Sequence, residues 1–194
     1  MEYLNNQMKK WASRLRDDLR LTPSQSNMIA SSIFDEIKNL SLPVKKEIEN
    51  STPIPIKARL DELLAFQRWM DFADSMKIRK PEVIRAQVIT QNYICFVYLK
   101  ETWFEILLKY LSQDTATYKS CSFLLSEPIK FLRHGISHGN WKYKDDFSGL
   151  EYWNRKDRSS PYVYRQINQQ ELDFWQSLSR TTAYSSFLAI TNHT

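Results

Sequence analysis

One short segment of this sequence places a permanently charged side chain and two histidines close together. Arg133, His134 and His138 lie within residues 131–139, which read FLRHGISHG. Histidine can take up or release a proton near neutral pH, and arginine can hold a phosphate and stabilise negative charge that develops on it. Together these residue types suit cleavage of RNA by its own 2′-hydroxyl group. The segment is therefore the first candidate for a functional site.

The spacing of Arg133 and His138 does not by itself bring the two side chains together. Residues five positions apart on an ideal helix are offset by about 140° around the axis. Distortion at Gly135 and the helix end expected at Gly139 could turn both side chains toward one cleft. A second copy of the protein could also complete the geometry. We therefore expect dimerisation to be part of the function.

The pattern around these residues resembles the Arg-x4-His motif of the HEPN superfamily. His134 fills the polar position after the arginine, and residues 132–141 are similar to HEPN-like bacterial proteins of plasmids and chromosomes, in which Gly-Asn-Trp and a short β element follow the motif. The likeness covers residues 56–190 in layout and about ten residues in motif detail.

The resemblance implies a metal-independent endoribonuclease that leaves a 2′,3′-cyclic phosphate and a 5′-hydroxyl. Such proteins are usually homodimers whose two motifs face each other, and many belong to toxin–antitoxin or defence systems, so an antitoxin is a possible protein partner. In this chain, His138 would be the general acid or base, Arg133 would stabilise charge on the phosphate and His134 would assist. The main alternative is a non-catalytic HEPN-like module that binds RNA or a protein.

Other interpretations of the same residues stay open. Arg133 could form a surface ion pair with Glu127 or Asp145, and His138 could interact with the last carbonyls of its helix. His134 and His138 are four apart and share a helix face, as in some metal sites, but no third ligand is evident. We predict no metal and no cofactor.

A group of polar, basic and aromatic residues beside the motif is predicted to contact the substrate: Ser137, Asn140, Lys142, Tyr143 and Lys144. Interleaved aromatic and basic side chains suit stacking on unpaired bases while holding phosphates. Arg155, Lys156 and Arg158 could extend this group. The alternative for the aromatic residues is that Trp141, Trp153 and Trp175 pack the following hairpin onto the bundle.

Helical periodicity dominates the chain up to residue 139. Thr22, Pro23 and Gln25 form a helix start with a predicted capping box. Apolar residues recur at spacings of three and four through the expected helices, which cover residues 3–21, 23–40, 56–76, 82–112, 116–126 and 127–139. Residues 44–50 are expected to be a linker or a single-turn helix. Residues 82–112 are apolar on most faces, so this helix should lie centrally.

The pattern changes after Trp141. Aromatic and β-branched residues alternate on both sides of a polar turn, which predicts a β-hairpin over residues 149–167. Asn168 and Glu171 mark the start of a last helix that extends to residue 190. We therefore predict an all-α, HEPN-like helical bundle with a small C-terminal β-hairpin. Residues 1–52 would form an N-terminal helical extension and residues 53–194 the bundle.

The composition limits the class of protein. A length of 194 residues fits one domain with elaborations, and only three glycines leave no Gly-rich nucleotide loop. A net charge of +5 permits RNA as a partner without requiring it. Cys95 and Cys121 form no CxxC pair, the start of the chain resembles no secretory signal, and no apolar stretch approaches the roughly 20 residues that span a bilayer. We expect a cytoplasmic protein with no membrane partner.

Overall fold

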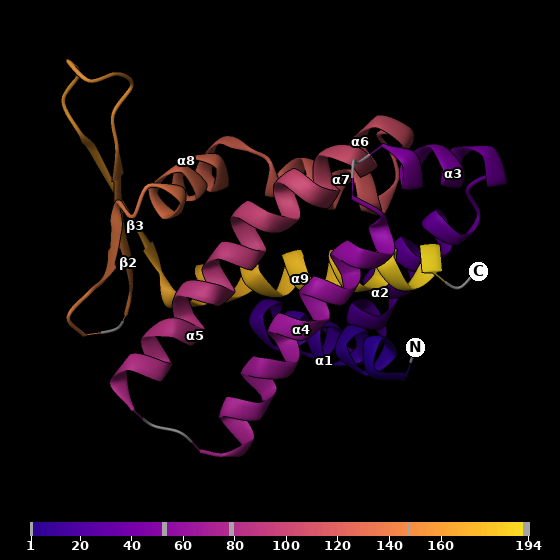
Figure 1. The fold of residues 1–194 in the computed structure, drawn as a ribbon, viewed down its shortest axis with the longest axis horizontal. Helices are drawn as coiled ribbons and strands as arrows, with labels where there is room; N and C mark the ends of the chain where they lie inside the picture. The colour runs from indigo at the N-terminus through magenta and orange to yellow at the C-terminus, as the bar shows by residue number, and fades with distance from the viewer. Residues whose placement is uncertain (1, 52–53, 78–79, 147, 192–194) are drawn as a thin grey trace.

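The structure is a computed structural model that describes residues 2–51, 54–77, 80–146 and 148–191, and it is mostly helical (Figure 1). The helices are α1 (Glu2–Leu19), α2 (Pro23–Lys38), α3 (Leu42–Asn50), α4 (Ile56–Ser75), α5 (Pro81–Tyr93), α6 (Glu105–Tyr110), α7 (Ala116–Leu124), α8 (Glu127–Ser137) and α9 (Gln169–Thr191). A small sheet comprises β1 (Trp141–Tyr143), β2 (Gly149–Asn154) and β3 (Val163–Asn168). Among the described helices, none combines the length and the apolar composition that crossing a bilayer requires.

Helix α9 runs through the middle of the molecule, with the sheet at its beginning and the chain terminus at its far end (Figure 1). Every residue from Ser177 to Ile190 is buried. Helices α1, α2 and α7 all pack against it. A helix surrounded on all sides belongs at the centre of a bundle, and in this chain that helix is α9.

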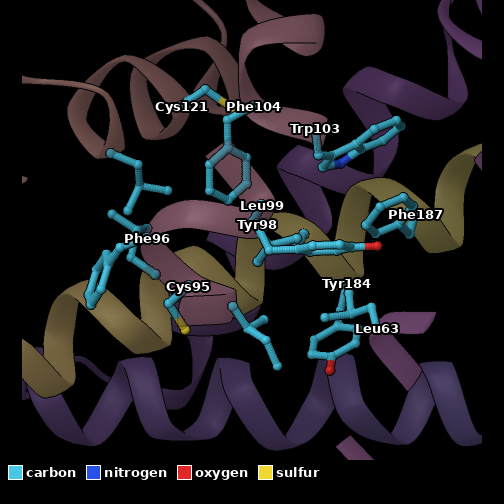
Figure 2. Packing of buried hydrophobic residues seen from close by; sticks show 14 of the residues in the cluster. Leu63, Cys95, Phe96, Tyr98, Leu99, Trp103, Phe104, Cys121, Tyr184 and Phe187 are labelled. Atoms are coloured by element: carbon cyan, nitrogen blue, oxygen red, sulfur yellow. The ribbon is translucent and has the colours of Figure 1, made fainter. Parts of the chain in front are cut away.

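The helix predicted over residues 82–112 is present as a succession of helical segments rather than one regular helix. Two π-helical segments, η1 (Ile94–Tyr98) and η2 (Lys100–Phe104), lie between α5 and α6. Residues 94–99 are buried, as the apolar sequence predicts. Figure 2 shows Phe96, Leu99 and Trp103 within the same core as Tyr184 and Phe187 of α9. The ring of Trp103 stacks on that of Phe187, with centroids 4.3 Å apart.

The first two helices contribute to this core. Leu4, Trp11 and Leu15 of α1 belong to the same hydrophobic cluster as α9, and α2 packs on both α1 and α9. The capping box of Thr22 and Gln25 at the start of α2 is confirmed. The expected linker at 44–50 is a longer helix, α3. The predicted boundary between residues 52 and 53 falls outside the described residues.

The predicted hairpin is confirmed as the antiparallel pair β2 and β3, and β1 adds a third strand outside the predicted range of 149–167, directly after the motif helix. Leu150, Tyr152 and Ile167 are buried on the inner face of the sheet, against the helices. Glu151 and Trp153 alternate with them and therefore lie on the outer face. Trp153 thus does not pack the hairpin onto the bundle.

Trp141 and Trp175, which were expected to pack the hairpin onto the bundle together with Trp153, do contact the core. Trp175 is buried, and Trp141 lies half-buried against the hydrophobic cluster. Trp153 differs because the period of two along a strand directs it away from the helices.

Candidate active site

Helix α8 is strongly amphipathic, and this property decides which side chains it exposes. Ile129, Leu132 and Ile136 are buried at spacings of three and four. Consequently His134 and His138 lie on the opposite, solvent-facing side and are exposed, while Arg133 lies half-buried at the edge of the helix. The sequence therefore places all three motif side chains within reach of a ligand.

The end of α8 is fixed by two backbone hydrogen bonds that form a Schellman motif. The Asn140 N–H donates to the carbonyl oxygen of Gly135 at 2.7 Å, and the Gly139 N–H donates to that of Ile136 at 3.2 Å. Gly139 adopts a left-handed φ of 68°, as this motif requires. His138 is the C-cap residue. Its position is therefore set by the helix end and not by a loop.

The sheet holds α8 in place. The Trp153 N–H donates to the Asn140 carbonyl at 3.0 Å, and the Asn154 side-chain amide donates to the Phe131 carbonyl at 2.6 Å. A Cβ atom on Gly135 would lie 3.3 Å from the Cβ of Tyr152, so the helix approaches β2 closely here. The motif helix thus rests on a rigid neighbour.

The two histidines of the motif lie side by side. Their ring centroids are 6.4 Å apart and the ring planes differ by 13°. One turn of helix separates the two residues, which explains the parallel arrangement. Two exposed imidazoles at this separation can serve two sites of proton transfer on one substrate.

The surroundings of His134 hold its pKa below the ordinary value of 6.5. Partial burial is the largest cause, followed by the positive charges of Arg133, His138, Lys130 and Lys100. Lowering the pKa favours the neutral imidazole, which can accept a proton at neutral pH. The same positive charges favour an anionic ligand at this face.

Arg133 has no carboxylate partner in the described part of the chain. Glu127, one of its expected partners, instead pairs with Lys130, with Nζ and Oε1 3.1 Å apart. No ion pair with Asp145 is present among the described residues. The guanidinium charge is therefore available to a ligand. The interpretation of Arg133 as half of a surface ion pair is not supported.

Arg133 and His138 do not meet within one subunit. In the described residues no hydrogen bond or ring contact joins their side chains, in keeping with their offset around the helix. The imidazole of His138 also makes no hydrogen bond to the last carbonyls of α8; its backbone N–H makes those bonds to His134 and Ile136. His138 is therefore free to act on a ligand.

The predicted substrate-binding residues do not form one cluster. Ser137 is exposed at the end of α8, and Asn140 supplies its backbone to the contacts described above. Lys142 pairs with Glu151 on the outer face of the sheet at 3.1 Å. Tyr143 lies half-buried against the core, and burial raises its pKa. Lys144 borders a shallow hollow beside Lys142 that also contains acidic side chains.

Two lysines that the sequence did not single out belong to the site. Lys130 precedes His134 by one helical turn, so its place on the same face could have been inferred from spacing. Lys100 comes from η2, far away in the sequence, and no local signal could have found it. It pairs with Glu105 at 2.9 Å and also influences the His134 pKa.

No group of three or more potential metal ligands from His, Cys, Asp and Glu occurs among the residues that the structure describes. The two free cysteines, Cys95 and Cys121, are buried in the core, away from the exposed motif. His193, considered as a third ligand for the two motif histidines, lies outside the described residues.

No family model, curated protein or solved structure matches this chain. The roles of its residues are therefore assigned from their chemistry and placement.

Proposed function

We propose that this protein is a metal-independent endoribonuclease of the HEPN type. The observation that supports the proposal most strongly is the pair of exposed, parallel imidazoles of His134 and His138 on a face that also carries Lys130 and Lys100. Arg133 adds a guanidinium beside them, and within the described residues no carboxylate pairs with it. A proton carrier, a second imidazole and a concentration of positive charge are what cleavage by an RNA 2′-hydroxyl requires.

The proposed reaction is an internal transfer at one phosphate. A bond forms between the 2′-oxygen and phosphorus while the bond from phosphorus to the 5′-oxygen breaks. One imidazole accepts the proton of the 2′-hydroxyl, and the other donates a proton to the leaving 5′-oxygen. His138 takes one of these roles and His134 assists in the other, while Arg133 stabilises the charge on the phosphate oxygens. The products are a 2′,3′-cyclic phosphate and a 5′-hydroxyl.

A homodimer is part of the proposal, because Arg133 and His138 do not meet within one chain. Helices α4 and α5 project from the body of the molecule (Figure 1). Their solvent-facing sides carry a group of exposed large apolar residues: Phe66, Trp69, Phe72, Met76, Ile84, Ile89 and Tyr93. Exposed large apolar residues on two neighbouring helices are typical of an interaction site.

The charges around this α4–α5 surface favour a second copy of the chain as its partner. The same two helices carry charges of both signs, Asp74 and Glu82 as well as Arg68 and Arg85, and all four residues are exposed. A two-fold interface brings each patch against itself, so charges within it can pair across the interface only where one patch carries both signs. We propose that the two chains associate here.

The proposed activity is tested by incubating purified protein with end-labelled RNA in excess EDTA. We expect wild type to cleave, and His138→Ala and Arg133→Ala to lose about a hundredfold or more of the rate, because proton transfer and charge stabilisation each contribute on that scale. Lys119→Ala, which removes an exposed lysine on α7, is the matched control and should cleave as wild type does.

Equal cleavage by wild type and both site variants would contradict the assignment. RNA binding without cleavage would favour the non-catalytic alternative, an RNA-binding module that uses the same face.

A further inference from the structure

We propose that the outer face of the β2–β3 hairpin is a stacking surface for the unpaired bases of single-stranded RNA. Trp153, Tyr162 and Tyr164 form this stacking surface, with Arg155 beside it. The inference names the substrate class of the proposed ribonuclease, and to that extent it rests on the proposed function. The binding surface itself depends only on residues of the hairpin.

The three rings form a row. Trp153 and Tyr164 are register partners across β2 and β3, and their ring centroids are 5.9 Å apart with planes at 32°. Tyr162 lies two residues before Tyr164, so its side chain lies on the same side of the extended chain as that of Tyr164. Its ring centroid is 6.5 Å from that of Tyr164. A row of separate ring faces can receive successive bases of one strand.

These rings are not needed to fill the core. The side chains of Tyr164 and Tyr162 are 70% and 42% exposed, and neither residue belongs to the hydrophobic cluster. The hairpin tip projects away from the helices (Figure 1). Exposed aromatic rings on a projecting hairpin pair with each other across the strands but do not fill the core of this fold, which makes them candidates for a binding surface.

Positive charge borders the rings. The guanidinium carbon of Arg155 lies 5.0 Å from the ring centroid of Tyr162, and Arg155 also donates a hydrogen bond to the Arg158 carbonyl oxygen at 3.0 Å. Lys156 and Arg158 are exposed at the same tip. The tip therefore offers cations to a phosphate backbone beside aromatic faces for its bases.

The acidic groups nearby are already engaged. The carboxylate of Asp157 accepts hydrogen bonds from the N–H groups of Ser159 and Ser160, both at 2.9 Å. Glu151 binds Lys142 at 3.1 Å and Gln166 at 3.1 Å. Lys142 offsets the charge of Glu151, and the Asp157 carboxylate is held by the backbone of the tip, so the three basic side chains Arg155, Lys156 and Arg158 still outnumber the acidic ones at the tip.

Single-stranded RNA fits this surface better than other ligands. A duplex keeps its bases stacked inside and cannot present their faces to aromatic rings. Proline-rich peptides bind aromatic grooves but do not call for three basic side chains at the rim. The combination of exposed aromatic rings and positive charge favours an unpaired polynucleotide.

The test measures binding of a fluorescent oligouridine by anisotropy, with His138→Ala present in every protein so that nothing is cleaved. We expect Tyr164→Ala to weaken binding by about fivefold or more, as loss of one base–aromatic stack does. Tyr164→Phe should bind as the parent does, because it keeps the ring face. Arg155→Ala should reduce the dependence of affinity on salt.

Phe123→Ala is the matched control, because it removes a 38% exposed aromatic ring from α7. Its affinity for oligouridine should not change. A duplex RNA of the same length should bind the parent and Tyr164→Ala alike.

Three results would overturn the inference: unchanged oligouridine affinity in Tyr164→Ala, an equal loss in the Phe123→Ala control, or displacement of oligouridine by a proline-rich peptide. The proposed function is judged separately. If Tyr164→Ala loses binding while the chain with His138 restored never cleaves RNA, the stacking surface stands and the ribonuclease fails. If the chain cleaves RNA and Tyr164→Ala binds oligouridine normally, the ribonuclease stands and the stacking surface fails.

Discussion

His134 experiences the positive charges of Lys130 and Lys100 as well as those of its motif partners. Together with partial burial, which is the larger cause, these charges lower the pKa of His134 and favour its neutral imidazole. A neutral imidazole in the motif suits the step in which the proton of the 2′-hydroxyl is taken.

The lowered pKa of His134 predicts a specific dependence of stability on pH. In the unfolded chain this histidine should titrate near its ordinary 6.5, and in the folded chain lower. As the pH falls below 6.5, the unfolded chain therefore binds more protons, and the free energy of unfolding decreases; well above 6.5 the residue has no effect.

We expect His134→Gln to remove this part of the pH dependence. The measurement is urea unfolding of wild type and variant at a series of pH values on both sides of 6.5. Identical pH profiles for the two proteins would show that the pKa of His134 is not lowered in the folded chain.

At the scale of one element, the end of α8 decides where His138 lies. The expectation that Gly139 ends the motif helix is confirmed by its left-handed φ of 68°. A Cβ atom there would meet nothing within 4 Å, so any cost of a side chain arises from the backbone conformation alone.

We predict that Gly139→Ala lowers the free energy of unfolding by about 1 kcal/mol, the typical cost of a left-handed alanine. Gly139→Asn should cost less, because asparagine tolerates this conformation. Chemical denaturation of the three proteins measures the difference. Equal stability of Gly139→Ala and wild type would mean that the helix end differs from the one described.

Local patterns predicted much of the element layout because helices and strands are specified by nearby residues. The start of α2 at Thr22 and the β2–β3 hairpin follow from capping and alternation. The start of α7 at Ala116 was expected as well, but not the partner of its first N–H groups: those of Ala116 and Thr117 donate to the carboxylate of Glu36 from α2, at 2.7 and 2.8 Å. Contacts between residues so distant in sequence leave no local signal.

At the scale of the whole molecule, a buried polar network joins four helices. Arg180 of α9 is fully buried and donates to Gln91 of α5 at 2.9 Å and to the Tyr184 hydroxyl at 3.2 Å. Its guanidinium also lies over the Trp11 ring of α1. Tyr184 in turn donates to Gln67 of α4 at 3.3 Å. The sequence predicts α9 as a helix, and only the packing reveals that its polar side chains are enclosed as well as its apolar ones.

Arg180→Ala should lower the free energy of unfolding by about 3 kcal/mol, because it leaves a cavity and removes the hydrogen-bond donor of buried Gln91. Arg180→Met keeps most of the volume and should cost less. Urea unfolding compares the two. A stability of Arg180→Ala equal to that of wild type would show that the network does not hold the four helices together.

Association of two chains through the α4–α5 surface is a property of the whole molecule. We expect light scattering of wild type to give twice the chain mass of 23.1 kDa, and Phe72→Glu to give a single chain with reduced RNA cleavage. Phe123→Glu, on α7, should stay dimeric. A wild-type protein that is monomeric and fully active would contradict the role assigned to the α4–α5 surface.

The central claim is cleavage by the RNA's own 2′-hydroxyl at a site formed by Arg133 and His138. The most direct measurement compares, in EDTA, an all-ribose RNA with the same RNA carrying one 2′-deoxynucleotide immediately 5′ of the cleaved bond. We predict that wild type cleaves the first to a 2′,3′-cyclic phosphate and a 5′-hydroxyl, leaves the deoxy position uncut, and loses activity in His138→Ala. Cleavage at the deoxy position, or cleavage only after metal is added, would contradict the claim.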